Sequence, residues 1–460
     1  MQGTLKNNHS NSAYLELDRL IPPDHILRKI DKVVDFSFVN SETELCYCPN
    51  NGRPSIPPEL YFRMELIGYF FNIRSARKLV ENVRYNISYR WFCKLTIDDN
   101  VPNHASLSRI KKRYSCEIFE KFFHSILYQC RIAGLLDSNS VMTDTILIQA
   151  NASLDSMQPR EGSYEKTKSS TPGVAPPPKR EISNITHQSI SDPDATLAFK
   201  AGTTRSLKYK AHTCIDSKSR VISAIKVTTG AVHDSQPYLE LIKHLTTDLE
   251  LNINETIADR AYGVGHIIFT LREQGIETFI PLFSGRSGAS RHTVTAGFCY
   301  DKEKNVYVCP ANFELTPGKI YKDYFAYHSS AKNCRNCHIR QNCQAPEKKS
   351  SHIRVITRHQ HFDLFQSIQQ EMETGSFKKK LSERLWKIEG VMNELKNYHG
   401  LTKAKFRGLQ NMQIQAYMAA IAVNIKRLIF IYIFLRVCRY SDQKISPFTT
   451  GRVVFQANIL

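Results

Sequence analysis

Two short stretches decide the fold: residues 141–150 read VMTDTILIQA, and residues 255–263 read ETIADRAYG. Each has the apolar, β-branched character of a strand, and each carries one aspartate, Asp144 or Asp259. A carboxylate in such a setting is costly unless a cation pairs with it or a metal ion binds it. Taken singly, an aspartate at the end of a strand is more often a turn former or a helix cap than a catalytic group.

The residues between and after these stretches extend the pattern. A hairpin around 216–220 is followed by a helix (SQPYLELIKHLTTDL), the strand of Asp259, a helix (VGHIIFTLREQG) and a last strand (IETFIPLF). Three strands followed by this alternation predict an α/β (α+β) fold, with a mixed sheet flanked by helices. Residues 155–193 are rich in Ser, Thr, Lys and Pro and are predicted to form a flexible loop.

The length of 460 residues favours about two or three domains. Changes in composition place the boundaries. We expect an all-helical, basic N-terminal domain over 1–135, the first part of the mixed-sheet domain over 136–283, a Gly-, Cys- and Lys-rich insertion over 284–351, and a helical C-terminal part of the sheet domain over 352–460.

The charge points to a polyanionic partner. The chain has 62 Lys and Arg against 43 Asp and Glu, a net charge of +19, and nucleic acid is the commonest partner of such a protein. No secretory signal is visible, and the apolar stretch 428–435 is far shorter than the roughly 20 residues that span a bilayer. Twelve cysteines without an export signal favour a reducing compartment, so we expect a cytoplasmic protein without membrane contact.

A third acid comes from the predicted helix LSERLWKIEGVMNELKNYHGL. Glu389 and Lys396 are seven residues apart and therefore share one face of that helix. An acid with a lysine two turns away suits a site that binds a metal ion and contacts a phosphate backbone; a solvated helix face is the plainer interpretation. Glu383 and Glu394 are rivals for this third acid, and Asp234 is a rival for Asp259, although a helix cap or a supporting residue suits Asp234 better.

Taken together, these blocks resemble the bacterial insertion-sequence transposases of the DDE type. The resemblance covers most of the chain. Its blocks are LIPPDHILRKIDKVVDFSF, NGRPSIPPEL and VPNHASLSRIKKR at the N-terminus, TDTILIQANAS, SDPDA, TTGAVHDS and ADRAYG in the middle, and IEGVMNELKNYHGLTKAKFRGL and AVNIKRL near the C-terminus. The combination is specific, although no single block is.

The resemblance implies an RNase H-like catalytic core with two Mg²⁺ (or Mn²⁺) ions per active site. Asp144, Asp259 and Glu389 would be the first, second and third metal-binding acids, and Lys396 the basic residue that contacts DNA. Related families often carry an Arg four residues before the Glu and a Tyr three residues before that Arg, where this chain has Leu385 and Ser382. Arg384 is a poor substitute, because it lies more than 90° around the helix from Glu389.

The resemblance also implies the reaction: metal-dependent cleavage of double-stranded DNA at the terminal inverted repeats of an insertion sequence, followed by transfer of the freed 3′-OH to target DNA. A homodimer in the DNA complex and a bacterial, nucleoid-associated location would follow. Two alternatives stay open. One is an inactive, transposase-derived DNA-binding protein, and the other is a hydrolytic nuclease of the same fold that cuts without joining.

Four cysteines in the insertion have the spacing of a structural zinc site: Cys309, Cys334, Cys337 and Cys343. His338 could replace one thiolate, and four reduced thiols in a loop are the alternative. The insertion has little apolar sequence with which to hold itself, which favours zinc, and related transposases carry a similar block.

The stretch 395–441 contains no acidic residue. It begins on the helix of Glu389, and part of it is apolar at helical spacing. We expect its cations to contact DNA phosphates. The candidates are Lys396, Lys403, Lys405 and Arg407.

Overall fold

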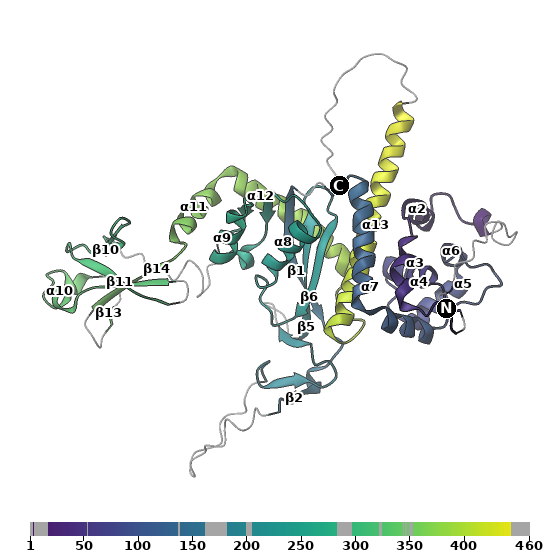
Figure 1. Cartoon of the computed structure of the whole chain (residues 1–460), viewed down its shortest axis with the longest axis horizontal. Coiled ribbons are helices and arrows are strands. Elements are labelled where there is room, and N and C mark those ends of the chain that lie inside the picture. Colours follow the sequence, from purple (N-terminus) through teal and green to yellow (C-terminus); the bar gives the residue numbers. More distant parts are fainter. Residues whose placement is uncertain are drawn as a thin grey trace, which may run out of the picture. The chain divides into compact units, whose positions relative to one another are not determined.

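The computed structural model of the chain, drawn in Figure 1, divides into two compact units. Unit 1 consists of Met1–Leu136, Glu394–Phe406 and Gln410–Leu460, and unit 2 of Asp137–Asn393 and Arg407–Leu409. The residues that the structure describes are 3, 17–52, 54–136, 139–161, 182–198, 205–282, 297–321, 324–343, 345, 347–348 and 353–442.

Unit 1 is helical in its described residues. Its helices are α2 (Ile26–Val33), α3 (Phe38–Thr43), the short η2 (Glu44–Cys46), α4 (Pro58–Phe70), α5 (Ala76–Tyr85), α6 (Ile87–Phe92), α7 (His104–Ile132) and α13 (Leu409–Asp442). Several begin at side-chain caps that the sequence supplies. Ser75 accepts from the Lys78 amide before α5, and Asn103 accepts from the Ser106 amide before α7.

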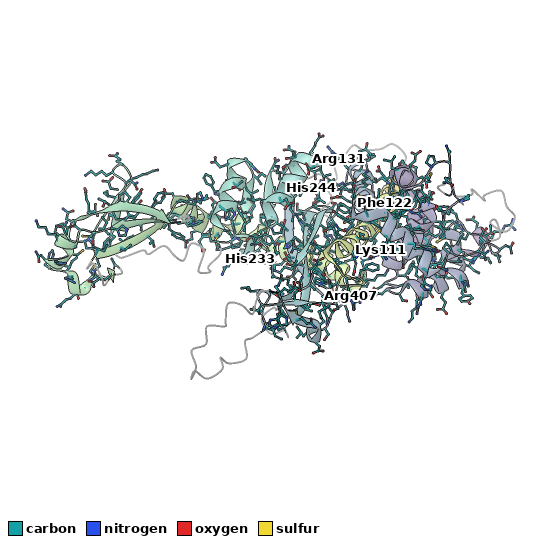
Figure 2. The ribbon with its side chains drawn as sticks, turned by 60° about the horizontal axis from the view of Figure 1, so that its bottom comes forward. Lys111, Phe122, Arg131, His233, His244 and Arg407 are labelled. Carbon is teal, nitrogen blue, oxygen red and sulfur yellow. The ribbon has the colours of Figure 1, made fainter. Side chains whose placement is uncertain are left out.

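Helix α4 forms the centre of unit 1, because nearly all of its side chains are buried. Its Phe62 packs edge to face on Phe122 of α7 with ring centroids 4.7 Å apart; Figure 2 labels Phe122. The buried Arg63 is neutralised by Asp31 at 2.7 Å and by Glu59 at 2.7 Å. A charged residue inside this core is therefore tolerated because it is paired.

Helix α13 packs within unit 1, whereas the sequence assigns residues 352–460 to the sheet domain. The ring of Tyr417 stacks on Phe123 of α7 at 5.5 Å, and its hydroxyl donates to Glu120 at 2.9 Å. Within α13, Leu409–Phe434 is the one described segment long and apolar enough to cross a membrane, and 61% of its most apolar window is buried. Such burial is what the core helix of a helical unit requires.

Unit 2 contains a mixed sheet. Its strands are β1 (Ser140–Gln149), β4 (Thr196–Ala198), β5 (Ser206–Asp216), β6 (Ile222–Thr229), β7 (Glu255–Ile257) and β8 (Glu277–Phe279). The order is β4-β5-β1-β7-β8, and β6 also pairs with β5. β5 runs antiparallel to β1 and β6, whereas β1, β7 and β8 are parallel. The predicted α/β (α+β) class is confirmed.

The helices of unit 2 include α8 (Tyr238–Lys243), which continues as the π-helical turn η5 (His244–Asp248), α9 (Gly265–Glu273), α11 (Phe362–Glu373) and α12 (Gly375–Asn397). Helix α8 covers one face of the sheet, where the Tyr238 hydroxyl lies 2.5 Å from that of Thr256. Because neighbouring residues of a strand point to opposite faces, the face of Ile257 is the other one. Helix α12 covers that other face through three contacts: Phe377 to Phe279, Lys380 to Glu255 and Arg384 to Asp144.

The stretch 155–193, predicted to be one flexible loop, begins and ends with short strands. After the single turn η3 (Leu154–Ser156), β2 (Met157–Pro159) pairs antiparallel with β3 (His187–Ser189). Period-two apolar patterning is weak in strands of three residues, so composition alone does not reveal them. The proline-rich middle, 162–181, lies outside the described residues.

The predicted insertion forms a second sheet. Its strands are β9 (Cys299–Asp301), β10 (Val306–Val308), β11 (Glu314–Tyr321), β12 (Tyr324–His328), β13 (Glu347–Lys348) and β14 (Ile353–His359), in the order β13-β14-β12-β11-β10-β9. The helix α10 (Ala331–Arg335) and the turn η8 (Arg340–Asn342) lie between β12 and β13. A single small cluster of buried residues forms its described core: Tyr307, Leu315, Tyr327, Ala345 and Ile356.

The last turn of α12 lies in unit 1 and carries a half-buried acid. Glu394 pairs with Arg427 at 2.6 Å and with Lys426 at 3.1 Å, both on α13. Burial opposes the ionisation of Glu394, but His399, Arg427 and Lys426 together outweigh it and lower the pKa of Glu394 to about 2. This ion-pair group ties the end of α12 to α13.

Replacing Glu394 by Gln is expected to lower the free energy of unfolding at pH 7 by up to about 3 kcal/mol. The folded-state pKa lies below the usual 4.5, so the stabilisation is complete above that pH and is lost as the pH falls toward about 2. Urea unfolding at pH 7 and pH 3.5 measures this, and the difference between variant and wild type should shrink at the lower pH. Glu373→Gln, which removes an exposed partner of Lys378, is the control and should change little.

Candidate active site

The two aspartates of the opening stretches lie level with each other on neighbouring strands. The parallel register pairs Val141 with Thr256 and Met142 with Ile257. Carried two residues further, it places Asp144 beside Asp259, and both side chains then point to the face that α12 covers. The sheet therefore brings two carboxylates together that are far apart in the sequence.

Asp259 is held by the turn that follows its strand. It is the N-cap residue of the short helical turn η6 (Arg260–Tyr262), and its Oδ1 accepts a hydrogen bond from the Ala261 amide at 2.8 Å. The buried Tyr262 anchors this turn, because its hydroxyl lies 2.7 Å from that of Thr145 on β1. The second carboxylate is thus fixed relative to the strand of the first.

Both oxygens of Asp144 have partners. Oδ1 accepts from the Thr145 amide at 2.7 Å, and Oδ2 pairs with the Arg384 guanidinium at 3.0 Å. Arg384 is buried and also donates to the carbonyl oxygen of Thr143 at 3.4 Å. A cation from α12 therefore lies directly at the first carboxylate.

Negative charge accumulates at this site. Burial raises the pKa of Asp144 above its usual range, and Arg384 and the Thr145 amide oppose that rise. The carboxylates of Asp259 and Asp234 add to it. Carboxylates gathered around a buried acid favour a bound cation, and a divalent metal ion is the strongest such partner for oxygen ligands.

Asp234, the rival for the second acid, has a partner of its own. Its carboxylate pairs with Lys210 at 2.7 Å, and it precedes the cap of α8, Pro237, so it is not the capping residue. Nearby, burial lowers the pKa of His212 to about 4, and both ring nitrogens bond to threonine hydroxyls. At neutral pH His212 is therefore an uncharged part of the sheet.

Glu389 lies on a different side of α12. The helix turns Arg384, Ile388 and Val391 inward, whereas Glu389 is exposed. Five residues separate Glu389 from Arg384, which is about 140° around the helix. Across the described ranges, no group of three or more His, Cys, Asp and Glu side chains is placed to hold a metal ion. The structure thus brings Asp144 and Asp259 together but does not add Glu389 to them.

The rivals for the third acid are both engaged in ion pairs. Glu383 pairs with Lys387 one turn along α12 at 2.9 Å, and Glu394 pairs with Arg427 and Lys426. Glu389, in contrast, makes no hydrogen bond or ion pair with the residues that the structure describes. Of these three glutamates it has the carboxylate most available to a ligand.

Arg384, Tyr262 and Thr145 contribute to the site and were not predicted. For Arg384 a signal was present, because residues 384, 388, 391 and 395 follow the spacing of one buried helix face. The position of Arg384 relative to Glu389 does not reveal this role, because Arg384 faces the sheet and not Glu389.

The four cysteines predicted to bind zinc are half-buried and unbridged. Cys309 follows β10 in a tight turn, where its Sγ accepts from the Phe313 amide at 3.4 Å. Cys309 and Cys343 both pack against the small core of the second sheet. Cys334 lies in α10 and contacts Ser329, and Cys337 follows it. Two of the four are thus placed at one cluster, without a complete metal-binding set in the described residues.

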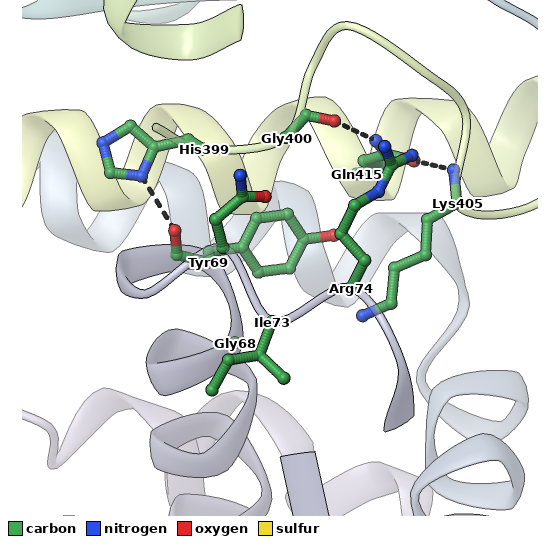
Figure 3. Close-up of a pocket in the computed structure, with 9 residues that line it drawn as sticks. Gly68, Tyr69, Ile73, Arg74, His399, Gly400, Lys405 and Gln415 are labelled. Carbon is green, nitrogen blue, oxygen red and sulfur yellow. Dashed lines mark hydrogen bonds between the residues drawn. The ribbon is translucent and has the colours of Figure 1, made fainter. Parts of the chain in front are cut away.

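The loop that joins α12 to α13 carries three of the predicted DNA-binding residues. Figure 3 shows how it is fastened: His399 Nδ1 bonds to the Tyr69 carbonyl oxygen at 2.9 Å, and Gln415 bonds to the Gly400 carbonyl and the Lys405 amide. The cavity beneath has a volume of about 20 Å³, room for roughly one water molecule. It is a feature of packing and not a ligand pocket.

The predicted DNA-binding cations differ in exposure. Lys405 is mostly buried, 3.8 Å from Glu65 and over the ring of Tyr69, so it is occupied within unit 1. Lys403 is exposed, and Lys396 is half-buried. Arg407, labelled in Figure 2, is exposed and donates through Nε to the Asn151 carbonyl oxygen at 3.0 Å.

Two family models match the chain. Residues 15–113 match a transposase domain (DUF772), and residues 308–429 match a transposase DDE domain. Among solved structures, the cryo-EM structure of the piggyBac transposase synaptic complex with hairpin DNA is similar with a TM-score of 0.34 and 9% identity, over 94% of this chain and 82% of that one. None of the curated proteins matches the chain.

Proposed function

The chain belongs to the DDE-type transposases, and from that premise we propose that it cuts DNA at the ends of an insertion sequence and joins the freed 3′-OH to target DNA. The observation that carries the proposal is the register that sets Asp144 beside Asp259 on the face covered by α12. Mg²⁺ sites that act on phosphates often use one or two carboxylates from the protein, and this pair supplies two.

The sheet supports an RNase H-like core. Apart from the short β4, which pairs with the start of β5, the sheet has three antiparallel strands, β6-β5-β1, formed by a meander. The strands β7 and β8 then continue it parallel to β1, joined through helices α8 and α9. A mixed sheet flanked by helices is what the resemblance implies. Asp144 then lies on the central strand, and Asp259 lies just after its parallel neighbour β7.

Asp144 and Asp259 would hold divalent metal ions, Mg²⁺ or Mn²⁺, with Glu389 as the third ligand. The donor set suits them, because hard cations prefer carboxylate oxygens and often use only one or two from the protein. Such ions lower the cost of in-line displacement at phosphorus. The protein's own part is positioning: the Ala261 and Thr145 amides and the Tyr262 hydroxyl hold the two carboxylates in place.

Double-stranded DNA is the proposed partner, and a homodimer is expected because an element has two ends. On unit 1, the exposed face of the first half of α7 carries Arg109, Lys112 and Arg113 opposite the buried Leu107 and Ile110. Arg109 and Lys112 have no ion pair among the described residues. With the exposed Lys403, these cations suit contact with phosphates.

Zinc is proposed for the cysteine set of the insertion. The second sheet has only a small described core, and Cys309 and Cys343 both border it. A zinc ion bound by Cys309, Cys334, Cys337 and Cys343 would be structural, because four thiolates leave no open position.

Asp144→Asn, Asp259→Asn and Glu389→Gln are each expected to abolish cleavage of element ends while DNA binding persists, because the metal-binding carboxylate is lost and the shape is kept. Cleavage of labelled terminal repeats with Mg²⁺, and a strand-transfer assay with pre-cut ends, measure this. Asp248→Asn, on an exposed acid outside the sheet, is the control. Wild-type cleavage by Glu389→Gln would remove that residue from the active site.

Lys403→Gln is expected to weaken DNA binding about 2- to 5-fold at 0.15 M salt and to reduce the salt dependence of affinity, because one phosphate contact is lost. Lys405→Gln should instead lower thermal stability, because it leaves Glu65 without its partner in a buried setting. Fluorescence anisotropy over a salt series and thermal unfolding separate the two effects. Equal loss of affinity in both variants would contradict this division.

Protein purified without chelator should contain about one zinc ion per chain by elemental analysis. Cys337→Ser should lose that zinc, whereas Cys93→Ser, which changes a buried cysteine of unit 1, should keep it. A zinc content near zero in folded wild-type protein would exclude the site.

A further inference from the structure

The metal-binding acids proposed above are accompanied by a cation that the protein supplies itself. Arg384 is buried, and its guanidinium lies 3.0 Å from Asp144 Oδ2. The pair lies on the face of the sheet that also carries Asp259. The position at which a divalent ion would neutralise Asp144 therefore already faces a positive group.

The hydrogen bonding of Arg384 is incomplete. Its Nη2 reaches Asp144 and, at 3.4 Å, the Thr143 carbonyl oxygen, whereas its buried Nε has no hydrogen-bond partner. An arginine that serves only to join α12 to the sheet would gain more from a two-pronged contact, in which two N–H groups bind the carboxylate. A contact through one N–H group costs less free energy to break than a contact through two.

A divalent ion and this guanidinium cannot both be fully stabilised by Asp144. Oδ1 accepts from the Thr145 amide, and Oδ2 is the oxygen that already carries a cation. A metal ion on Oδ2 would lie close to the guanidinium, and two positive charges at that separation in a buried site repel each other strongly.

Resting on the proposed metal site, we propose that Arg384 is the resident counter-cation of Asp144 and competes with the divalent ion for it. In the metal-free protein it pairs with the carboxylate and holds it in place. Metal binding must draw Asp144 away from Arg384, so the protein binds metal more weakly than the carboxylates alone would allow. Because such coupling is reciprocal, metal binding also loosens the contact of α12 with β1 at this point.

The test measures Mn²⁺ binding by the full chain without DNA, from the electron paramagnetic resonance signal of free Mn²⁺, together with thermal unfolding in EDTA and in Mn²⁺. Arg384→Met should bind Mn²⁺ about tenfold more tightly than wild type, within the usual range of coupling between two sites. It should also unfold at a lower temperature in EDTA and gain more from Mn²⁺ than wild type does. Arg384→Lys, which keeps the charge, should stay near wild type.

Lys387→Met is the matched control, because it removes a cation from the same helix that pairs with Glu383 and not with Asp144. Its Mn²⁺ affinity should not change. If Arg384→Met unfolds in EDTA and folds in Mn²⁺, the proposal is supported. If Arg384→Met folds neither in EDTA nor in Mn²⁺, Arg384→Gln is used in its place, because it keeps an N–H donor without the charge. Arg384→Gln is also expected to bind Mn²⁺ about tenfold more tightly than wild type.

Equal or weaker Mn²⁺ binding by the uncharged variants would overturn the proposal and make Arg384 a positioning residue. Asp144→Asn separates this failure from failure of the proposed function. If it abolishes Mn²⁺ binding while Arg384→Met has no effect, the metal site stands and the competition does not. If Asp144→Asn binds Mn²⁺ as wild type does, the proposed metal site itself is wrong.

Discussion

The register between β1 and β7 is the constraint on which the rest of unit 2 depends. By setting Asp144 level with Asp259, it forces two negative charges together on a largely apolar sheet. Three kinds of group offset that repulsion. The amides of Thr145 and Ala261 donate to the two carboxylates, and the buried Arg384 guanidinium of α12 pairs with Asp144. The Tyr262 hydroxyl fixes the turn of Asp259. The divalent ions proposed above would supply the remaining positive charge.

The sequence patterns were sufficient to predict the longer strands and helices of this sheet, because each pattern involves only residues that are close together in the chain. An apolar, β-branched run marks β1, a hairpin pattern marks β5 and β6, and helix-like stretches mark α9 and α12, so their order could be derived. Short strands were missed: β2 and β3 have three residues each, too few for a period to show. The pairing of Asp144 with Asp259 was only implied by the family resemblance, because register depends on contacts between distant segments.

Side-chain roles were harder to predict than elements. No role at the active site was predicted for Arg384, because it does not share a helix face with Glu389. It contacts Asp144 of the sheet instead. Lys405 was grouped with DNA-binding cations by sequence position, yet it is a mostly buried partner of Glu65. A cation in a basic stretch can serve structure or a ligand, and only burial and partners decide which.

Helix α13 belongs to unit 1, although the whole of the sheet lies before it in the chain. Its Tyr417 packs on Phe123 of α7, and its Lys426 and Arg427 neutralise Glu394. During synthesis on the ribosome, unit 1 therefore cannot complete its core until α13 emerges. Until then, part of the apolar surface of helices α2 to α7 stays exposed to water. A chain that stops before residue 409 would leave that surface open, and it would be exposed to chaperones and proteases rather than stored as a folded fragment.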